Sequence, residues 1–92
     1  METKENKLKV YKFQQKGWIQ TEQLLNDDIA IVVDQTQNRI YFWSGKKSKP
    51  QAIEMAKKNL LIKKIQYSNY QYRNNQAEFP SPIMEEITKS LK

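Results

Sequence analysis

The chain contains neither cysteine nor histidine among its 92 residues. Without cysteine it can form no disulfide and no thiolate metal site, which is compatible with a reducing compartment. Without histidine it lacks the commonest general base and the commonest transition-metal ligand. Nucleophilic machinery of the Ser-His-Asp and Cys-His types is therefore excluded, and we do not expect an enzyme.

Glycine and long apolar runs are also scarce. Gly17 and Gly45 are the only glycines, so the chain has no glycine-rich phosphate-binding loop. The longest apolar run extends only from Ile29 to Val33, whereas a membrane-spanning helix needs about 20 residues. The first ten residues carry charges where a signal peptide has its apolar region. We therefore expect no transmembrane segment and a cytoplasmic location.

Acidic residues are outnumbered, with 10 Asp and Glu against 16 Lys and Arg and a net charge of +6. The two signs are separated, because segment 18–34 contains acids and no base, whereas segment 39–64 is strongly basic. The basic segment contains Arg39, Lys46, Lys47, Lys49, Lys57, Lys58, Lys63 and Lys64, against Glu54 alone. Such an imbalance favours an acidic protein surface or anionic lipid headgroups as the partner. The alternative is that these lysines only keep the surface solvated.

Nucleic acid is a further candidate partner for a basic chain. Tyr67, Tyr70 and Tyr72 follow the basic segment, and aromatic side chains beside lysines can stack on bases. However, no sequence pattern of an RNA-recognition, KH or helix-turn-helix domain is present. We therefore do not expect nucleic acid to be the partner.

The first half of the chain predicts strands. Residues 1–7 have no apolar anchor and predict a flexible tail, whereas segments 8–13 and 18–21 predict a hairpin. Segment 29–33 is apolar at every position, which is typical of a strand buried on both faces. In segment 39–43 large side chains alternate, so Ile40 and Phe42 face one side while Tyr41 and Trp43 face the other. These two strands should be neighbours in the middle of the sheet.

The second half predicts two helices and a strand. Ser48 and Gln51 have capping-box spacing and Pro50 suits a first turn, so a helix is expected over about 49–63. We assign Met55, Ala56 and Leu60 to the side that packs on the sheet, and Ile53, Lys57, Lys58 and Leu61 to the outside. Segment 65–72 then predicts a strand near an edge.

Ser81 as N-cap, followed by Pro82 at the first helical position, predicts a short C-terminal helix. Its apolar stripe contains Ile83, Met84, Ile87 and Leu91. Helices available for both faces of a mixed sheet predict an α/β sandwich of the α+β kind.

Segment 25–60 combines three features at characteristic spacings. An Asp-Asp pair opens an apolar strand that ends in Asp, a second strand ends in Trp-x-Gly-Lys, and Pro-Gln precedes an alanine at the start of the long helix. The residues concerned are Asp27 to Asp34, Arg39 to Lys46 and Ser48 to Ala52. This combination resembles a gelsolin/villin-type repeat. The resemblance covers one domain over 8–92 and implies a gelsolin-like mixed sheet of about five strands between a long and a short helix.

The resemblance also implies a partner, actin or an actin homologue. In actin-binding repeats the long helix enters a hydrophobic cleft of actin, and here that surface falls on Ile53, Lys57, Lys58, Leu61 and Lys64. A lone domain would sequester monomers or cap a filament end, because severing requires linked domains. Some repeats of this kind bind no actin. The alternative function is therefore a non-catalytic module that binds another protein or anionic lipid.

Calcium is the cofactor that the resemblance implies, and its ligands would be Asp27 and Asp28. The glutamate ligand that such repeats carry early in the long helix is replaced by Ala52. Glu54 cannot take its place, because two residues along a helix turn the side chain by about 200°. A calcium ion takes six or more oxygens, so we expect at most a weak site. The alternative is that the two aspartates only form a turn.

Overall fold

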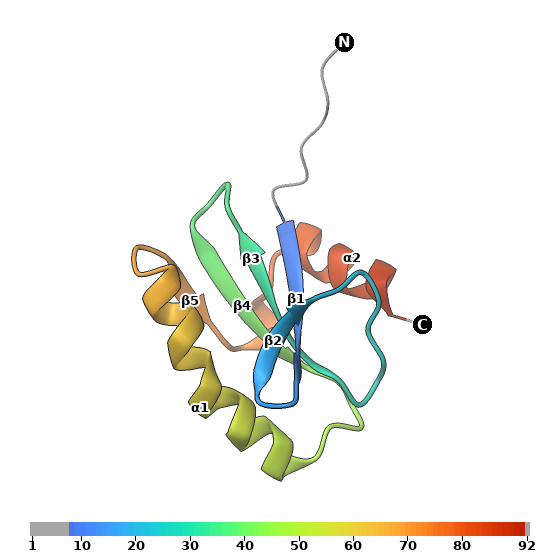
Figure 1. The fold of residues 1–92 in the computed structure, drawn as a ribbon. Coiled ribbons are helices and arrows are strands. Elements are labelled where there is room, and N and C mark those ends of the chain that lie inside the picture. Colours follow the sequence, from blue (N-terminus) through green and yellow to red (C-terminus); the bar gives the residue numbers. More distant parts are fainter. Residues whose placement is uncertain (1–7, 92) are drawn as a thin grey trace.

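A five-stranded sheet lies between two helices in the computed structural model (Figure 1). The structure describes residues 8–91, so the tail predicted for residues 1–7 lies outside it, as does Lys92. The elements are β1 (Leu8–Gln14), β2 (Gly17–Gln20), β3 (Ile29–Asp34), β4 (Arg39–Ser44), α1 (Pro50–Gln66), β5 (Gln71–Arg73), the 3-10 turn η1 (Gln76–Glu78) and α2 (Ser81–Ser90).

The strand order in the sheet is β2-β1-β3-β4-β5. Every neighbouring pair is antiparallel except β4 with β5, which is parallel because α1 crosses between these two strands. The sheet is therefore mixed, as the sequence predicts, and the β1–β2 hairpin is confirmed. β3 and β4 occupy the interior of the sheet as neighbours, which is also as predicted.

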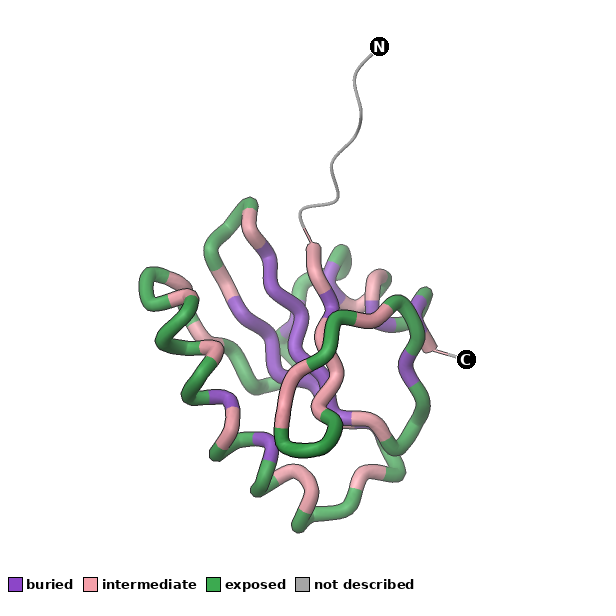
Figure 2. Tube along the Cα trace, in the orientation of Figure 1, coloured by how far each residue is buried: buried purple, intermediate pink, exposed green. Residues whose placement is uncertain are grey.

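The centre of the sheet is buried on both faces (Figure 2). All six residues of β3 are buried, Asp34 included, so the prediction that the apolar run 29–33 is a strand buried on both faces is confirmed. β4 divides its large side chains as expected. Tyr41 and Trp43 enter the core under α2, whereas Ile40 and Phe42 enter the core under α1. The two helices thus cover opposite faces, and each face has its own apolar core.

The loop that follows β4 is fixed against the turn that precedes β3. The N–H of Gly45 donates to the carbonyl of Asp28 at 2.9 Å, and the N–H of Lys47 donates to the carbonyl of Asn26 at 2.8 Å. Gly45 is buried there, and a Cβ at this position would overlap the main-chain oxygen of Asn26. The glycine of the Trp-x-Gly-Lys motif is therefore required by close approach of two backbones.

Gly45→Ala is expected to destabilise the domain, because two hydrogen-bonded backbone segments must separate to admit one methyl group. Overpacking of this kind costs about 1–3 kcal/mol. Urea denaturation followed by circular dichroism measures the change, with Gly17→Ala as the control, since a Cβ on Gly17 would meet only a main-chain oxygen at an ordinary 3.9 Å. Equal stability of Gly45→Ala and the parent would contradict the packing described for this loop.

The ends of the long helix differ from the prediction. α1 begins at Pro50 with Lys49 as N-cap, and no side chain caps it. The predicted capping box is wrong, because the Ser48 hydroxyl donates instead to the carbonyl of Asp28 at 3.0 Å. At the other end the helix continues to Gln66, where Lys63 and Lys64 in the last turn suit the negative end of the helix dipole. The strand predicted over 65–72 is consequently only β5.

The start of the short helix is also corrected. Its N-cap is Pro80 and its first residue is Ser81, so Ser81 is not the cap that the sequence predicts. The predicted stripe holds, since Ile83 and Ile87 are buried against the sheet and Met84 and Leu91 pack at the margin. Neither helix, nor any other in residues 8–91, has the length and apolar composition needed to cross a bilayer.

Candidate functional site

The long helix α1 carries apolar side chains on two opposite sides. On the inner side Ala56 and Leu60 are completely covered by the sheet. On the outer side the exposed fractions are 46% for Met55, 61% for Leu61, 63% for Ile62 and 73% for Ile65. These four residues, together with the lysine between them, are called the outward face below: Met55, Lys58, Leu61, Ile62 and Ile65.

The spacing of these residues places them on one surface. Positions 55, 58, 62 and 65 recur every three or four residues, which aligns them along a helix, and Leu61 lies beside them. Single exposed apolar residues are common on soluble proteins. Four exposed apolar side chains along three helical turns, with Lys58 as the one charged residue in the row, are different, because larger apolar patches mark interaction surfaces. The sequence of α1 therefore offers more apolar surface than the sheet can cover.

Contacts with the sheet fix the rotation of α1. The indole Nε1 of Trp18 on β2 donates to the carbonyl of Asn59 at 3.1 Å. After the helix ends, the ring of Tyr67 packs against that of Tyr70 in a tilted arrangement, with centroids 4.9 Å apart. Burial, together with a hydrogen bond to Tyr11 on β1, raises the pKa of Tyr67 above its usual value. Because these contacts orient α1, the outward face points away from the sheet.

Lysines accompany the apolar side chains of the outward face in two groups. Lys63 and Lys64 turn back to the sheet, where their Nζ atoms lie 4.1 Å from the ring centroids of Tyr11 and Tyr72. These are cation–π contacts that hold the two charges at the flanks of the helix. Lys57 and Lys58 are exposed on the solvent side of the helix. The apolar row therefore lies within a field of positive charge in which Glu54 is the one acid of α1.

Comparison with the sequence predictions requires two exchanges. Leu61 is exposed as predicted, and it lies next to Lys57 and Lys58. Met55, which we assigned to the core, is exposed, whereas Ile53, which we assigned to the outside, is half-buried against the core under α1. The prediction erred because α1 is apolar on both sides, so its periodicity alone does not say which side is inside.

Sequence reasoning missed Ile62 and Ile65 altogether. Ile65 was assigned to a strand, although it belongs to the last turn of α1. A usable signal existed, because a helix with Ala56 and Leu60 inside has positions 62 and 65 on its far side. Ile62, inside the helix predicted over about 49–63, would then be recognised as exposed, and Ile65 would follow once the helix is extended to Gln66.

In the turn that contains Asp27 and Asp28, the carboxylate and carbonyl oxygens of Asp28 already accept hydrogen bonds from within the chain. The Asp28 carboxylate accepts the N–H of Leu25 at 2.8 Å, so Asp28 stabilises the turn before β3. The Asp28 carbonyl already accepts two hydrogen bonds, from Gly45 and Ser48. Within residues 8–91 no group of three acids, or of other metal-ligating residues, stands close enough to hold an ion. The donor set is therefore poor for calcium, which takes six or more oxygens.

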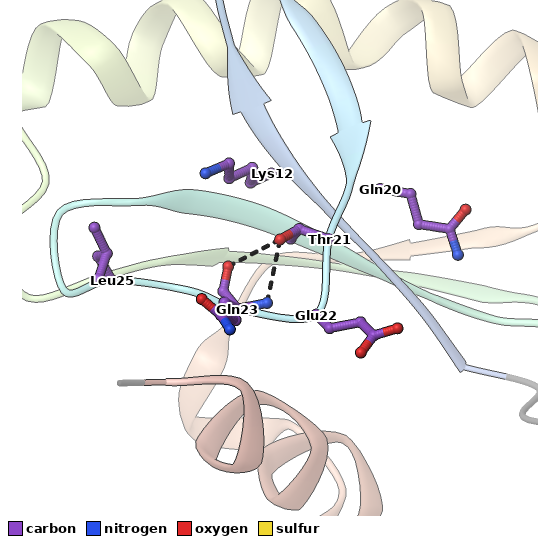
Figure 3. Close-up of a pocket in the computed structure, with 6 residues that line it drawn as sticks. All are labelled: Lys12, Gln20, Thr21, Glu22, Gln23 and Leu25. Atoms are coloured by element: carbon purple, nitrogen blue, oxygen red, sulfur yellow. Dashed lines mark hydrogen bonds between the residues drawn. The ribbon is translucent and has the colours of Figure 1, made fainter.

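A hollow beside the hairpin is a second surface feature of the fold. Figure 3 shows Lys12, Gln20, Thr21, Glu22, Gln23 and Leu25 around it. The Thr21 hydroxyl donates to the carbonyl of Gln23 at 3.0 Å and accepts its N–H at 3.1 Å, so it serves the local turn. The acid and the amides around the hollow come from exposed chain and do not converge on one point (Figure 3). The outward face is therefore the better candidate.

The fold has a counterpart among solved structures. A chain in the crystal structure of the Thorarchaeota ProGel/rabbit actin complex superposes with a TM-score of 0.71, covering 85% of this chain and 96% of that one, at 14% sequence identity. No known family matches the sequence, and no curated protein matches it. At such low identity the likeness concerns the fold alone. A mixed five-stranded sheet between a long and a short helix, in this arrangement, is a gelsolin-like fold.

Proposed function

We propose that this chain is a non-catalytic cytoplasmic module that binds actin or an actin homologue through the outward face of α1. The observation that carries the proposal is the row of four exposed apolar side chains on the long helix of a gelsolin-like fold. A helix laid into a hydrophobic groove is a common way to recognise a protein, with anchors spaced by three and four residues. The solved structure with the same fold was determined as a complex with actin, which supports the proposal.

The residues of the proposed interface have different roles. Leu61, Ile62 and Ile65 are the apolar anchors, Met55 extends them toward the start of the helix, and Lys58 lies among them. Lys57 and Lys64 lie at one flank, and Ile53 lies at the inner margin, where its buried part supports the helix. Anchors provide affinity by leaving water, whereas peripheral lysines mainly attract an acidic surface and orient it.

A single module with one such face suits monomer sequestration or capping of a filament end. Severing a filament needs two linked sites that raise each other's effective concentration. The test is a polymerisation assay with purified actin, supplemented by co-sedimentation. Sequestration predicts that filament mass at steady state falls in proportion to added protein, whereas capping predicts slower elongation at far lower ratios. The absence of any effect and of any co-sedimentation at high concentration would reject actin as the partner.

Charge reversal at Lys57 and Lys58 tests the proposed steering role. Lys57→Glu combined with Lys58→Glu is expected to lower the association rate constant by about tenfold at low salt and to weaken its salt dependence. Stopped-flow mixing with actin at several ionic strengths measures this rate constant. The matched control is Lys46→Glu with Lys47→Glu, which makes the same charge change in the loop after β4. Equal slowing by both pairs would show attraction by net charge rather than by this face.

An anionic membrane surface is the second candidate, favoured by the lysines that surround the apolar row. A helix with apolar anchors and flanking lysines can lie in the headgroup region of a bilayer. Flotation with liposomes distinguishes the two functions. Membrane binding predicts that the chain floats with vesicles containing phosphatidylserine and not with neutral ones. A chain that remains at the bottom of the gradient in both cases, yet binds actin, excludes this alternative.

Calcium should matter little to the natural chain, because Ala52 replaces the expected ligand. We propose Asp27 and Asp28 as at most a weak site, so millimolar calcium should leave the melting temperature almost unchanged. Ala52→Glu should create a rise in melting temperature on adding calcium, since a ligand that binds only the folded state stabilises it. Ala52→Gln is the control without the charge. A micromolar affinity of the parent chain in calorimetry would refute the argument.

A further inference from the structure

A pocket lies beside the paired strands β4 and β5, next to the segment that leads from β5 to α2. It has a volume of about 260 Å³, and its lining includes Arg39, Tyr41, Arg73, Asn75 and Glu78. The parallel pairing of β4 with β5 places Tyr41 beside Arg73 and Arg39 beside Gln71. Tyr41 enters the core under α2, and alternate residues of a strand share a face. Both arginines therefore belong to the face that α2 covers.

Neither guanidinium is neutralised within the described chain. The Nε of Arg39 is buried and has no hydrogen-bond partner among residues 8–91. Arg73 donates through Nη2 to Oε1 of Gln71 at 2.7 Å, and that acceptor carries no charge. A buried donor without a partner is costly and rare in native proteins. Arg39, which is partly buried, and Arg73, which is exposed, therefore bring two positive charges to one pocket.

We propose that this Arg39–Arg73 pocket binds the phosphate group of a small molecule. The planar guanidinium presents donors in a fixed fork that matches phosphate oxygens in bidentate geometry. Asn74 and Asn75 also line the pocket. The Oδ1 of Asn75 accepts the N–H of Ala77 at 3.2 Å, which leaves its NH2 group as a further donor. Two arginines and an amide offer more donors than a carboxylate has oxygens, whereas a phosphate monoester has three free oxygens to accept them.

Glu78 should weaken the affinity of the pocket for phosphate, so a substitution of Glu78 should have the opposite effect to a substitution of either arginine. Its exposed carboxylate lines the same pocket, and there it repels an anion. Removing this charge should therefore strengthen phosphate binding, while removing either arginine should weaken it. A site that only attracts anions through the net charge of the chain would not distinguish Glu78 from any other surface acid.

The experiment is a titration of the labelled full chain with sodium phosphate, followed by the arginine Nε–Hε signals in nitrogen-15 NMR spectra. Sodium chloride at matched ionic strength is the reference. We expect saturable shifts of Arg39 and Arg73, a dissociation constant raised at least about tenfold in Arg39→Gln and in Arg73→Gln, and a lower one in Glu78→Gln. Lys57→Gln, which removes the same charge on α1, should leave the constant within about twofold.

Further arms identify the ligand chemistry. Glycerol 3-phosphate that binds more tightly than inorganic phosphate identifies a monoester, and the reverse order identifies the free ion. Acetate that binds as tightly as either would overturn the assignment to phosphate. Arg39→Lys keeps the charge without the fork and is the variant to use if Arg39→Gln fails to fold, so full affinity in Arg39→Lys would refute bidentate recognition. Equal weakening by Lys57→Gln would refute the pocket itself.

Discussion

Trp43→Ala is expected to lower the free energy of unfolding by about 3–5 kcal/mol, the usual cost of removing a large buried aromatic side chain. Trp43 is only 6% exposed, and it packs under α2 with Tyr41, Ile83 and Ile87. The truncation leaves a cavity between the sheet and α2 that the rigid neighbouring strands cannot close. Because small domains have total stabilities of about 5–15 kcal/mol, the variant should lie close to unfolding at room temperature.

Chemical denaturation followed by circular dichroism measures this loss. Trp18→Phe is the matched control, since it keeps an aromatic ring but removes the hydrogen bond from Trp18 to the Asn59 carbonyl. The control should cost only about 1 kcal/mol. A denaturation midpoint of Trp43→Ala equal to that of the parent would mean that this tryptophan is not part of the core.

Leu61→Asp is expected to weaken actin binding by at least about 100-fold, because an unpaired charge would have to leave water within an apolar contact. The side chain is 61% exposed in the free chain, so the same substitution should leave the melting temperature within a few degrees of the parent. Affinity and stability are thereby separated in one variant. Fluorescence titration with actin measures the first, and a thermal melt measures the second.

Ile19→Asp is the control for Leu61→Asp. Like Leu61, Ile19 is a large apolar residue that is exposed, but it lies on β2 and not on α1. The Ile19→Asp variant should bind actin with the affinity of the parent, provided that a thermal melt shows that the variant is folded. Loss of binding in both variants would indicate a nonspecific effect of negative charge. Unfolding of Leu61→Asp would indicate that α1 is rotated relative to the description above.

The interior of the sheet could be predicted from the sequence because its residues show both a strand pattern and large apolar side chains for both faces. β3 is apolar from Ile29 to Val33 and β4 alternates large side chains, and only a strand covered on both faces needs either pattern. The glycine after β4 could be noticed in the sequence, but its reason could not. That reason is the approach of Asn26, which comes from a distant part of the chain.

The rotation and length of α1 could not be predicted in the same way. A helix that is apolar on both sides has no single preferred direction, so Met55 and Ile53 were exchanged. The contacts that decide the rotation join residues far apart in sequence, such as the 41-residue separation between Trp18 and Asn59. The three tyrosines after Lys64 predicted a strand over 65–72, whereas the helix runs to Gln66 and the N–H of Tyr67 donates to the Lys63 carbonyl at 2.9 Å. The candidate anchor Ile65 was lost with that error, whereas Ile62 lies inside the helix predicted over about 49–63 and was missed for lack of a known rotation.

The central claim is that the outward face of α1 contacts actin, and isoleucine methyl groups report on it directly. A deuterated chain with labelled isoleucine δ1 methyls is mixed with protonated monomeric actin, and saturation is transferred from actin across the interface. The account predicts strong signal loss at Ile62 and Ile65, whereas Ile83 and Ile87, buried under α2 on the opposite side of the sheet, keep their intensity. Binding with unchanged signals at Ile62 and Ile65 would contradict the account.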